Sequence, residues 1–108
     1  MAVMRFGSYT DDPVKNVYEL LGTEYTDKLA AKYPTLKPRQ RVMFILKRLW
    51  KKNIRHHNII VYRTGLAKGH DGKIYSFTEI AAANKLSRST AHQYFCKAVI
   101  LLKKLIDE

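Results

Sequence analysis

The chain has 108 residues and a mass of 12.6 kDa, which suits one compact domain and excludes two full-sized ones. Hydrophobic residues make up 46% and charged residues 27%, which is typical of a globular domain and not of a disordered tail. The net charge of +11 favours a polyanionic partner. No apolar run reaches the roughly 18 residues of a membrane span, and no signal peptide opens the chain, so we expect a cytoplasmic protein without membrane contact.

A small helical hairpin is predicted for the first part of the chain, residues 1–34. Asp12 is suited to cap a helix whose first residue is Pro13, and Gly22 is suited to end it. A second short helix is expected after Thr23 and stops before Pro34. The apolar side of the first helix has helical spacing: Val14, Val17, Tyr18 and Leu21. We expect this hairpin to pack on a main domain formed by residues 35–108.

An amphipathic helix is predicted from Pro38 to Lys52. Its apolar stripe comprises Val42, Ile45, Leu46 and Leu49, with Trp50 at its edge. The rest of the helix is positively charged and has no acidic residue: Arg39, Arg41, Lys47, Arg48, Lys51 and Lys52. Residues 35–75 hold eleven Lys and Arg against one acidic residue, so this third carries nearly all of the excess charge.

The helical period is lost between Asn53 and Tyr75. Ile59 to Tyr62 is a β-prone run, Lys73 to Tyr75 is a weaker one, and turn residues lie between them, so a small β-hairpin and a basic loop both fit. The glycines here lack the spacing of a phosphate-binding loop, and the histidines lack the spacing of a metal site. The sequence predicts no cofactor and no metal.

Two helices are predicted in the last third of the chain. Ser76 and Glu79 form a capping box that starts a short helix from Phe77 to about Asn84. Ser87 caps a longer helix that runs from Arg88 to at least Leu105.

The long helix is predicted to have a core side and a polar side. Its core stripe comprises Ala91, Phe95, Ala98, Leu102 and Leu105, and Cys96 is expected to be a small buried hydrophobe. The opposite side of its first turns presents side chains that hydrogen-bond bases or phosphates: Arg88, Ser89, His92, Gln93 and Lys97. This pattern favours a helix-turn-helix over a helical hairpin that serves only the core.

From Leu36 to Leu105 the chain resembles region 4 of bacterial sigma factors, which reads the −35 promoter element. The resemblance rests on the stretches 36–41, 65–66 and 72–75, and above all on Glu79-Ile80-Ala81 followed by Leu86-Ser87-Arg88-Ser89-Thr90. It implies a mainly α fold with a helix-turn-helix. Lys85 stands where a turn glycine is usual, which places a non-glycine residue at positive φ or changes the turn. Lys37 replaces the usual Thr cap, and about a dozen residues, 53–63, are inserted. Residues 1–34 match no sigma region, so a phage or mobile-element regulator fits better than a complete sigma factor.

The sequence thus predicts a double-stranded DNA-binding regulator of transcription without catalysis. Arg88 is expected to pair with guanine and Gln93 with adenine, and Ser89, Thr90 and His92 to make shorter contacts. Phosphate contacts, which carry no sequence information, are expected from the remaining set: Arg39, Arg41, Lys51, Lys52, Arg55, Arg63, Lys68, Lys73, Ser87 and Lys97.

Two alternatives stay open from the sequence. A sigma-like module can act by docking on RNA polymerase instead of on DNA, and a phage packaging terminase uses a small subunit with a basic helix-turn-helix. The oligomeric state, monomer or dimer, is also open, because the long apolar stripe can close one core or extend into a dimer seam. An enzyme is disfavoured, because no set of nucleophile, base and acid has supporting motif context.

Overall fold

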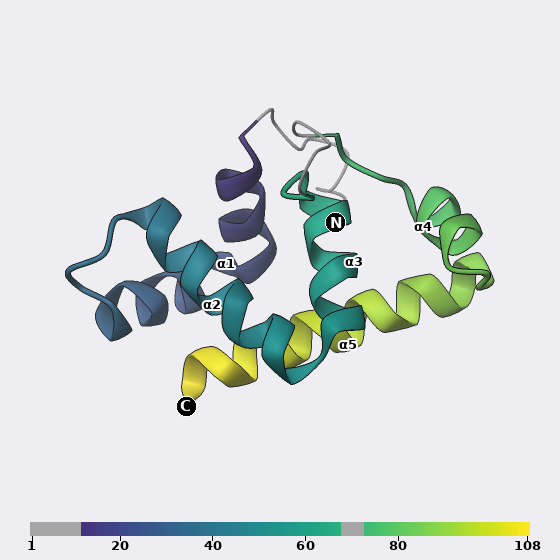
Figure 1. The fold of residues 1–108 in the computed structure, drawn as a ribbon. Helices are drawn as coiled ribbons and strands as arrows, with labels where there is room; N and C mark the ends of the chain where they lie inside the picture. Colours follow the sequence, from purple (N-terminus) through teal and green to yellow (C-terminus); the bar gives the residue numbers. More distant parts are fainter. Residues whose placement is uncertain (1–11, 68–72) are drawn as a thin grey trace.

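A computed structural model describes residues 12–67 and 73–108, and confirms the expected mainly helical fold (Figure 1). No strand occurs among these residues. None of their helices is long and apolar enough to cross a membrane. The five helices are α1 (Pro13–Lys32), α2 (Pro38–Lys52), α3 (Ile54–Thr64), α4 (Phe77–Ala83) and α5 (Arg88–Asp107).

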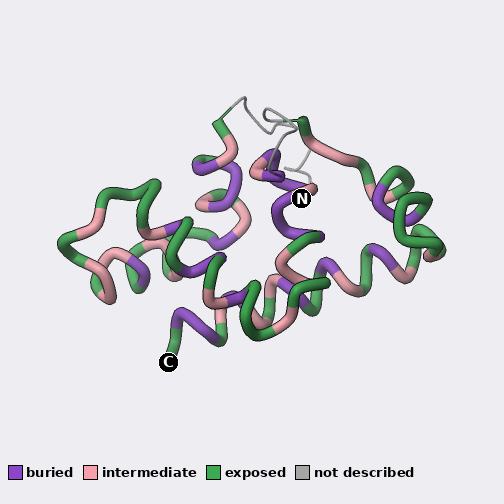
Figure 2. The backbone as a smooth tube through the Cα atoms, in the orientation of Figure 1, coloured by how far each residue is buried: buried purple, intermediate pink, exposed green. Residues whose placement is uncertain are grey.

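Helix α5 runs along one side of the molecule and packs against each of the other four helices (Figure 1). Helix α3 is central, since it also contacts all the others. Buried positions recur along α5 at helical spacing, as Figure 2 shows. One core cluster receives residues from all five helices, and the largest of its fully buried apolar side chains are Val17, Leu29, Val42, Ile45, Leu49, Ile60 and Leu102.

Helix α1 begins and bends where the sequence predicts. The Asp12 carboxylate accepts hydrogen bonds from the backbone N–H groups of Val14 and Lys15, at 3.1 and 3.3 Å. Gly22, with φ 84° and ψ 168°, interrupts the helical conformation, so α1 consists of two helical segments that meet at a sharp bend. The buried Asn16 side chain donates to the Thr64 carbonyl at 3.0 Å, which ties α1 to the end of α3.

Residues 54–64 form neither the β-hairpin nor the basic loop that the sequence allows, because Ile54–Thr64 is helix α3. Asn53 both ends α2 and caps α3, where its side chain accepts from the His56 N–H at 3.1 Å. Gly65 ends α3 in the left-handed conformation, with φ 92°. Four helices surround α3, so Ile59, Ile60 and Val61 are all buried. Burial on several sides hides the 3.6-residue period, and a short apolar run then resembles a strand.

The two C-terminal helices and their caps are present as expected. The turn between them places Lys85 at φ 56°, in the left-handed region. Of the two consequences expected from a lysine at this position, the structure shows the first, a non-glycine residue at positive φ.

We predict that Lys85→Gly raises the free energy of unfolding by about 0.5–1 kcal/mol, because relief of left-handed strain outweighs the extra chain entropy of glycine. Urea unfolding followed by circular dichroism measures the change. The control is Lys85→Ala, which removes the same charge and keeps the Cβ atom, and no gain is expected from it. Equal gains from both variants would trace the effect to charge instead of backbone strain.

Candidate nucleic-acid interface

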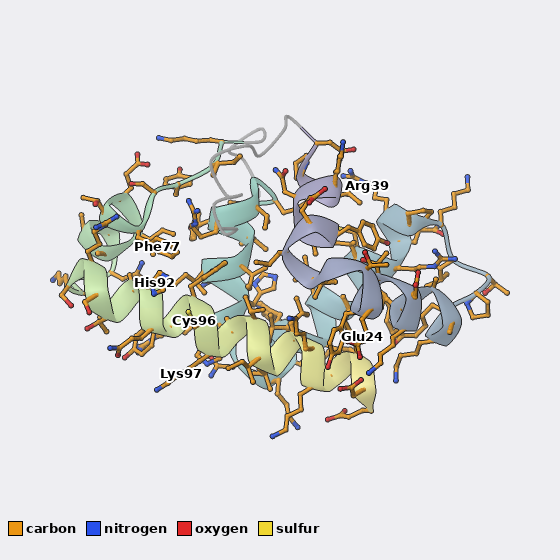
Figure 3. All side chains as sticks on the ribbon, turned by 180° about the vertical axis from the view of Figure 1, so that it is seen from behind. Glu24, Arg39, Phe77, His92, Cys96 and Lys97 are labelled. Carbon is orange, nitrogen blue, oxygen red and sulfur yellow. The ribbon has the colours of Figure 1, made fainter. Side chains whose placement is uncertain are left out.

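A surface hollow of about 610 Å³ lies at the start of α5. It is lined by four of the predicted DNA-reading side chains together with one residue of α4: Arg88, Ser89, His92, Gln93 and Phe77. We term it the α4–α5 hollow. The four α5 residues have the spacing of one helix face, and all four are exposed. Figure 3 shows Phe77 and His92 beside each other at one end of the molecule.

Phe77 is the member of the hollow that the sequence does not single out. Its ring contacts the rings of His92 and Phe95 edge-on, with centroids 5.0 and 5.3 Å apart. The guanidinium carbon of Arg63 lies 4.5 Å from the Phe77 centroid. Phe77 therefore joins the hollow to the core on one side and to α3 on another. An aromatic residue directly after the Ser76 cap is the signal that points to it.

Arg63, predicted to contact phosphate, is only 8% exposed. Its Nη1 donates to the Tyr75 carbonyl at 2.7 Å, while its guanidinium covers Phe77. Arg63 thus holds the segment before α4 against α3. This position corrects the prediction, because a buried, internally bonded guanidinium is not presented to a phosphate.

Ser87 and Thr90 form hydrogen bonds with each other at the start of α5. Ser87 Oγ accepts from the Thr90 N–H at 3.1 Å and donates to Thr90 Oγ1 at 2.8 Å. Thr90 is half-buried and does not line the α4–α5 hollow. The structure therefore brings four of the five predicted base-reading side chains together and leaves Thr90 in the cap.

A positive cluster lies beside α5 where α3 begins. The Arg55 guanidinium carbon is 5.6 Å from the Tyr94 ring centroid, and Lys97 is exposed on the same stretch of α5. The pKa of His56 is lowered below its ordinary 6.5, mainly by burial and further by the charges of Lys97 and Arg55. This imidazole is therefore neutral at pH 7. Lys51 and Lys52, which are exposed, precede α3 by one residue, Asn53. Four of the predicted phosphate contacts are thereby close to one another: Lys51, Lys52, Arg55 and Lys97.

Two other predicted phosphate contacts lie elsewhere. Figure 3 shows Arg39 in the other half of the molecule from His92. Arg41, close to it in α2, donates from Nε to the Tyr33 carbonyl at 3.0 Å. The fold therefore does not bring Arg39 and Arg41 to the α4–α5 hollow. Lys68 lies outside the described residues.

Carboxylates are kept away from this positive surface. The sequence has no acidic residue between Asp27 and Asp71, nor between Glu79 and Asp107. At the far end of α5, Asp107 pairs with Lys28 at 2.8 Å and Glu108 pairs with Arg48 at 2.8 Å. Lys28 of α1 and Arg48 of α2 are thus partly neutralised at that end of α5.

Glu79 is the one carboxylate on α4, and it is engaged in the predicted capping box. Its Oε1 accepts from the Ser76 N–H at 2.9 Å, and the Glu79 N–H donates to Ser76 Oγ at 3.1 Å. Lys73, a predicted phosphate contact, is exposed and has its Nζ 3.5 Å from Glu79 Oε2. The pKa of Glu79 is lowered below its ordinary 4.5, mainly by the hydrogen bond from the Ser76 N–H and further by the charge of Lys73.

We predict that Glu79→Gln lowers stability at pH 7 and that its deficit shrinks as the pH falls. A carboxyl whose pKa is lower in the folded state stabilises the fold above its unfolded pKa, and this contribution is lost as the pH falls through the folded pKa. The stability difference between Glu79→Gln and the unmodified protein is measured from their urea unfolding midpoints between pH 7 and pH 3. Glu19→Gln, an exposed carboxylate on α1, controls for the change in net charge. A gap that stays constant over this range would contradict the role of the Glu79 charge.

The prediction that Cys96 is buried is wrong. Cys96 is exposed, with its Sγ 3.8 Å from His92 Nδ1. It follows Phe95 by one residue, a rotation of about 100° that carries it off the core stripe. Among the described residues, no group of three or more His, Cys, Asp or Glu side chains is placed to hold a metal ion.

A scan against models of protein families, a search of curated proteins and a search of solved structures found no match to this chain.

Proposed function

We propose that this protein is a sequence-specific double-stranded DNA-binding regulator of transcription. In this proposal α4 and α5 act as a helix-turn-helix, and the first turns of α5 enter the major groove. One observation carries the proposal: four exposed hydrogen-bonding side chains of α5 line a single hollow beside a positive cluster. The resemblance to sigma region 4 in the same stretch of sequence supports the same function.

The side chains of the α4–α5 hollow suit base edges. The Arg88 fork matches the two acceptors of guanine, and the Gln93 amide matches the donor and acceptor of adenine. Ser89 and His92 supply shorter donors or acceptors. Phe77 provides an apolar wall of the kind that contacts the methyl group of thymine.

Cations around the hollow suit the DNA backbone. The positive cluster lies to one side, and Ser87 with the first N–H groups of α5 lies at the helix start, where phosphates bind readily. We assign the phosphate contacts of one bound duplex to Lys52, Arg55, Lys73, Lys97 and the first backbone N–H groups of α5. Arg39 and Arg41, which do not line the α4–α5 hollow, would meet a different length of DNA.

The test is selection of bound fragments from a genomic library at two salt concentrations, followed by sequencing. A motif that remains enriched at the higher salt supports sequence-specific binding, since non-specific complexes depend mainly on phosphate contacts and weaken steeply with salt. Binding that higher salt abolishes, with no motif, would contradict it. Light scattering addresses the packaging-subunit alternative, because a ring of about eight or more subunits would contradict a simple regulator.

A further inference from the structure

A second concave surface lies between α2 and α3. This groove has a volume of about 580 Å³ and shares no lining residue with the α4–α5 hollow. Its apolar wall includes Met43 and Trp50 from α2 and Leu66 and Ala67 after α3. Met43 is 46% exposed and Trp50 is 48% exposed, although both are large hydrophobic side chains. We term it the α2–α3 groove.

The exposed apolar residues of the groove occupy one face of α2. Met43, Lys47, Trp50 and Lys51 follow one another at spacings of four, three and one, which places them along one side of the helix. Aromatic residues and methionine are enriched where proteins meet proteins, and methionine adapts its shape to a partner side chain. An apolar wall offers a phosphate neither a positive charge nor a hydrogen bond, so the groove suits a protein partner better than nucleic acid.

Charge identifies the kind of partner. Lys47 lines the groove, Lys51 is one helical turn further along, and neither α2 nor α3 contains an acidic residue. A protein segment with carboxylates flanking its apolar side chains would pair with these ammonium groups. A second copy of this chain is a poor occupant, because two molecules of net charge +11 repel each other.

We infer that the α2–α3 groove is a docking site for an acidic amphipathic helix of a partner protein. Such a helix would insert apolar residues of one face between Met43 and Trp50 and direct its carboxylates to Lys47 and Lys51. The α3 wall of the groove lies in the stretch 53–63, where the sequence departs from sigma region 4. The inference does not rest on the proposed DNA binding, since the groove and the α4–α5 hollow share no lining residue.

Trp50 is the single tryptophan of the chain, so its fluorescence reports directly on the groove. The probe is a synthetic peptide of about 16 residues without Trp or Tyr, with Leu at helical spacing on one face and Glu on the others. Titration with this peptide is expected to give a saturable shift of Trp50 emission. A peptide of the same composition in scrambled order, and one with Lys in place of Glu, are each expected to bind at least about tenfold more weakly.

Two charge-matched variants locate the binding. Lys47→Glu is expected to lower the affinity for the Glu peptide about tenfold or more. Lys104→Glu, at an exposed position near the end of α5, should change that affinity about twofold at most. Circular dichroism confirms that both variants are folded. The inference is overturned if the Glu peptide gives no saturable shift, if either control peptide binds equally well, or if both variants behave alike. It is also overturned if duplex DNA displaces the peptide, or if Trp50 emission changes with protein concentration alone.

Discussion

Replacing Arg88 with alanine is expected to reduce affinity for the selected duplex about tenfold to hundredfold, the range for one good base contact. Affinity for random duplex should fall only about twofold to threefold, because one exposed charge contributes little to a non-specific complex. Arg88 is exposed and lines the α4–α5 hollow, so its removal leaves the core untouched. Fluorescence anisotropy with both duplexes at one fixed salt concentration measures the two losses.

Lys104→Ala is the matched control for Arg88→Ala. It removes one positive charge from the same helix, 16 residues further on, at a distance of about 24 Å along the axis. We expect Lys104→Ala to lower the affinity for both duplexes slightly and to the same extent. Equal losses on the selected and random duplexes in Arg88→Ala would make Arg88 a phosphate contact and would remove its assignment to a base.

Leu102→Ala is expected to lower the free energy of unfolding by about 2–5 kcal/mol, the usual result of truncating a fully buried leucine. Leu102 is 0% exposed and lies on α5, which contacts all four other helices. A total stability of about 5–15 kcal/mol is typical of a domain, so this loss is a large fraction of it. Urea unfolding followed by circular dichroism gives the value.

Ile100→Ala is the control on the same helix, two residues earlier. Its side chain is 65% exposed, so truncation leaves no internal cavity, and the expected change is within about 0.5 kcal/mol. If both variants lost the same stability, the assignment of the α5 core stripe would be wrong. A second copy covering Ile100 would instead make its effect depend on protein concentration.

Local signals in the sequence predict much of the fold. A capping side chain accepts a hydrogen bond from a backbone N–H only two or three residues further on. Asp12, Ser76 and Ser87 therefore mark the helix starts without knowledge of the rest of the chain. Gly22 and Lys85 likewise follow from backbone geometry alone. The core stripe of α5 is visible because one side of that helix is buried and the other is not.

Helix α3 escapes prediction because its environment, more than its own sequence, determines its conformation. The run Ile59 to Tyr62 has β-branched residues that favour a strand by propensity, and packing against four helices outweighs that preference. Asn53 and Gly65 are the local signals of its start and its end. A cap that serves two helices at once is easily taken for a loop.

The candidate site is predictable where it lies on one helix and not where it crosses between elements. Arg88, Ser89, His92 and Gln93 share a helix face, which their spacing reveals. Phe77 joins them through the packing of α4 on α5, and the buried Arg63 contacts Tyr75 and Phe77, which come from a later stretch of the chain. Contacts between elements distant in sequence have no periodic signal.

The separation of charge along the molecule affects how it meets a polyanion. Paired carboxylates lie at the far end of α5, with Asp107 and Glu108, whereas exposed cations gather where α3 begins. In the field of a negative surface this arrangement produces a torque that turns the positive end forward before contact. Encounters are then oriented as well as accelerated, and the association rate constant should fall more steeply with ionic strength than the dissociation rate constant rises.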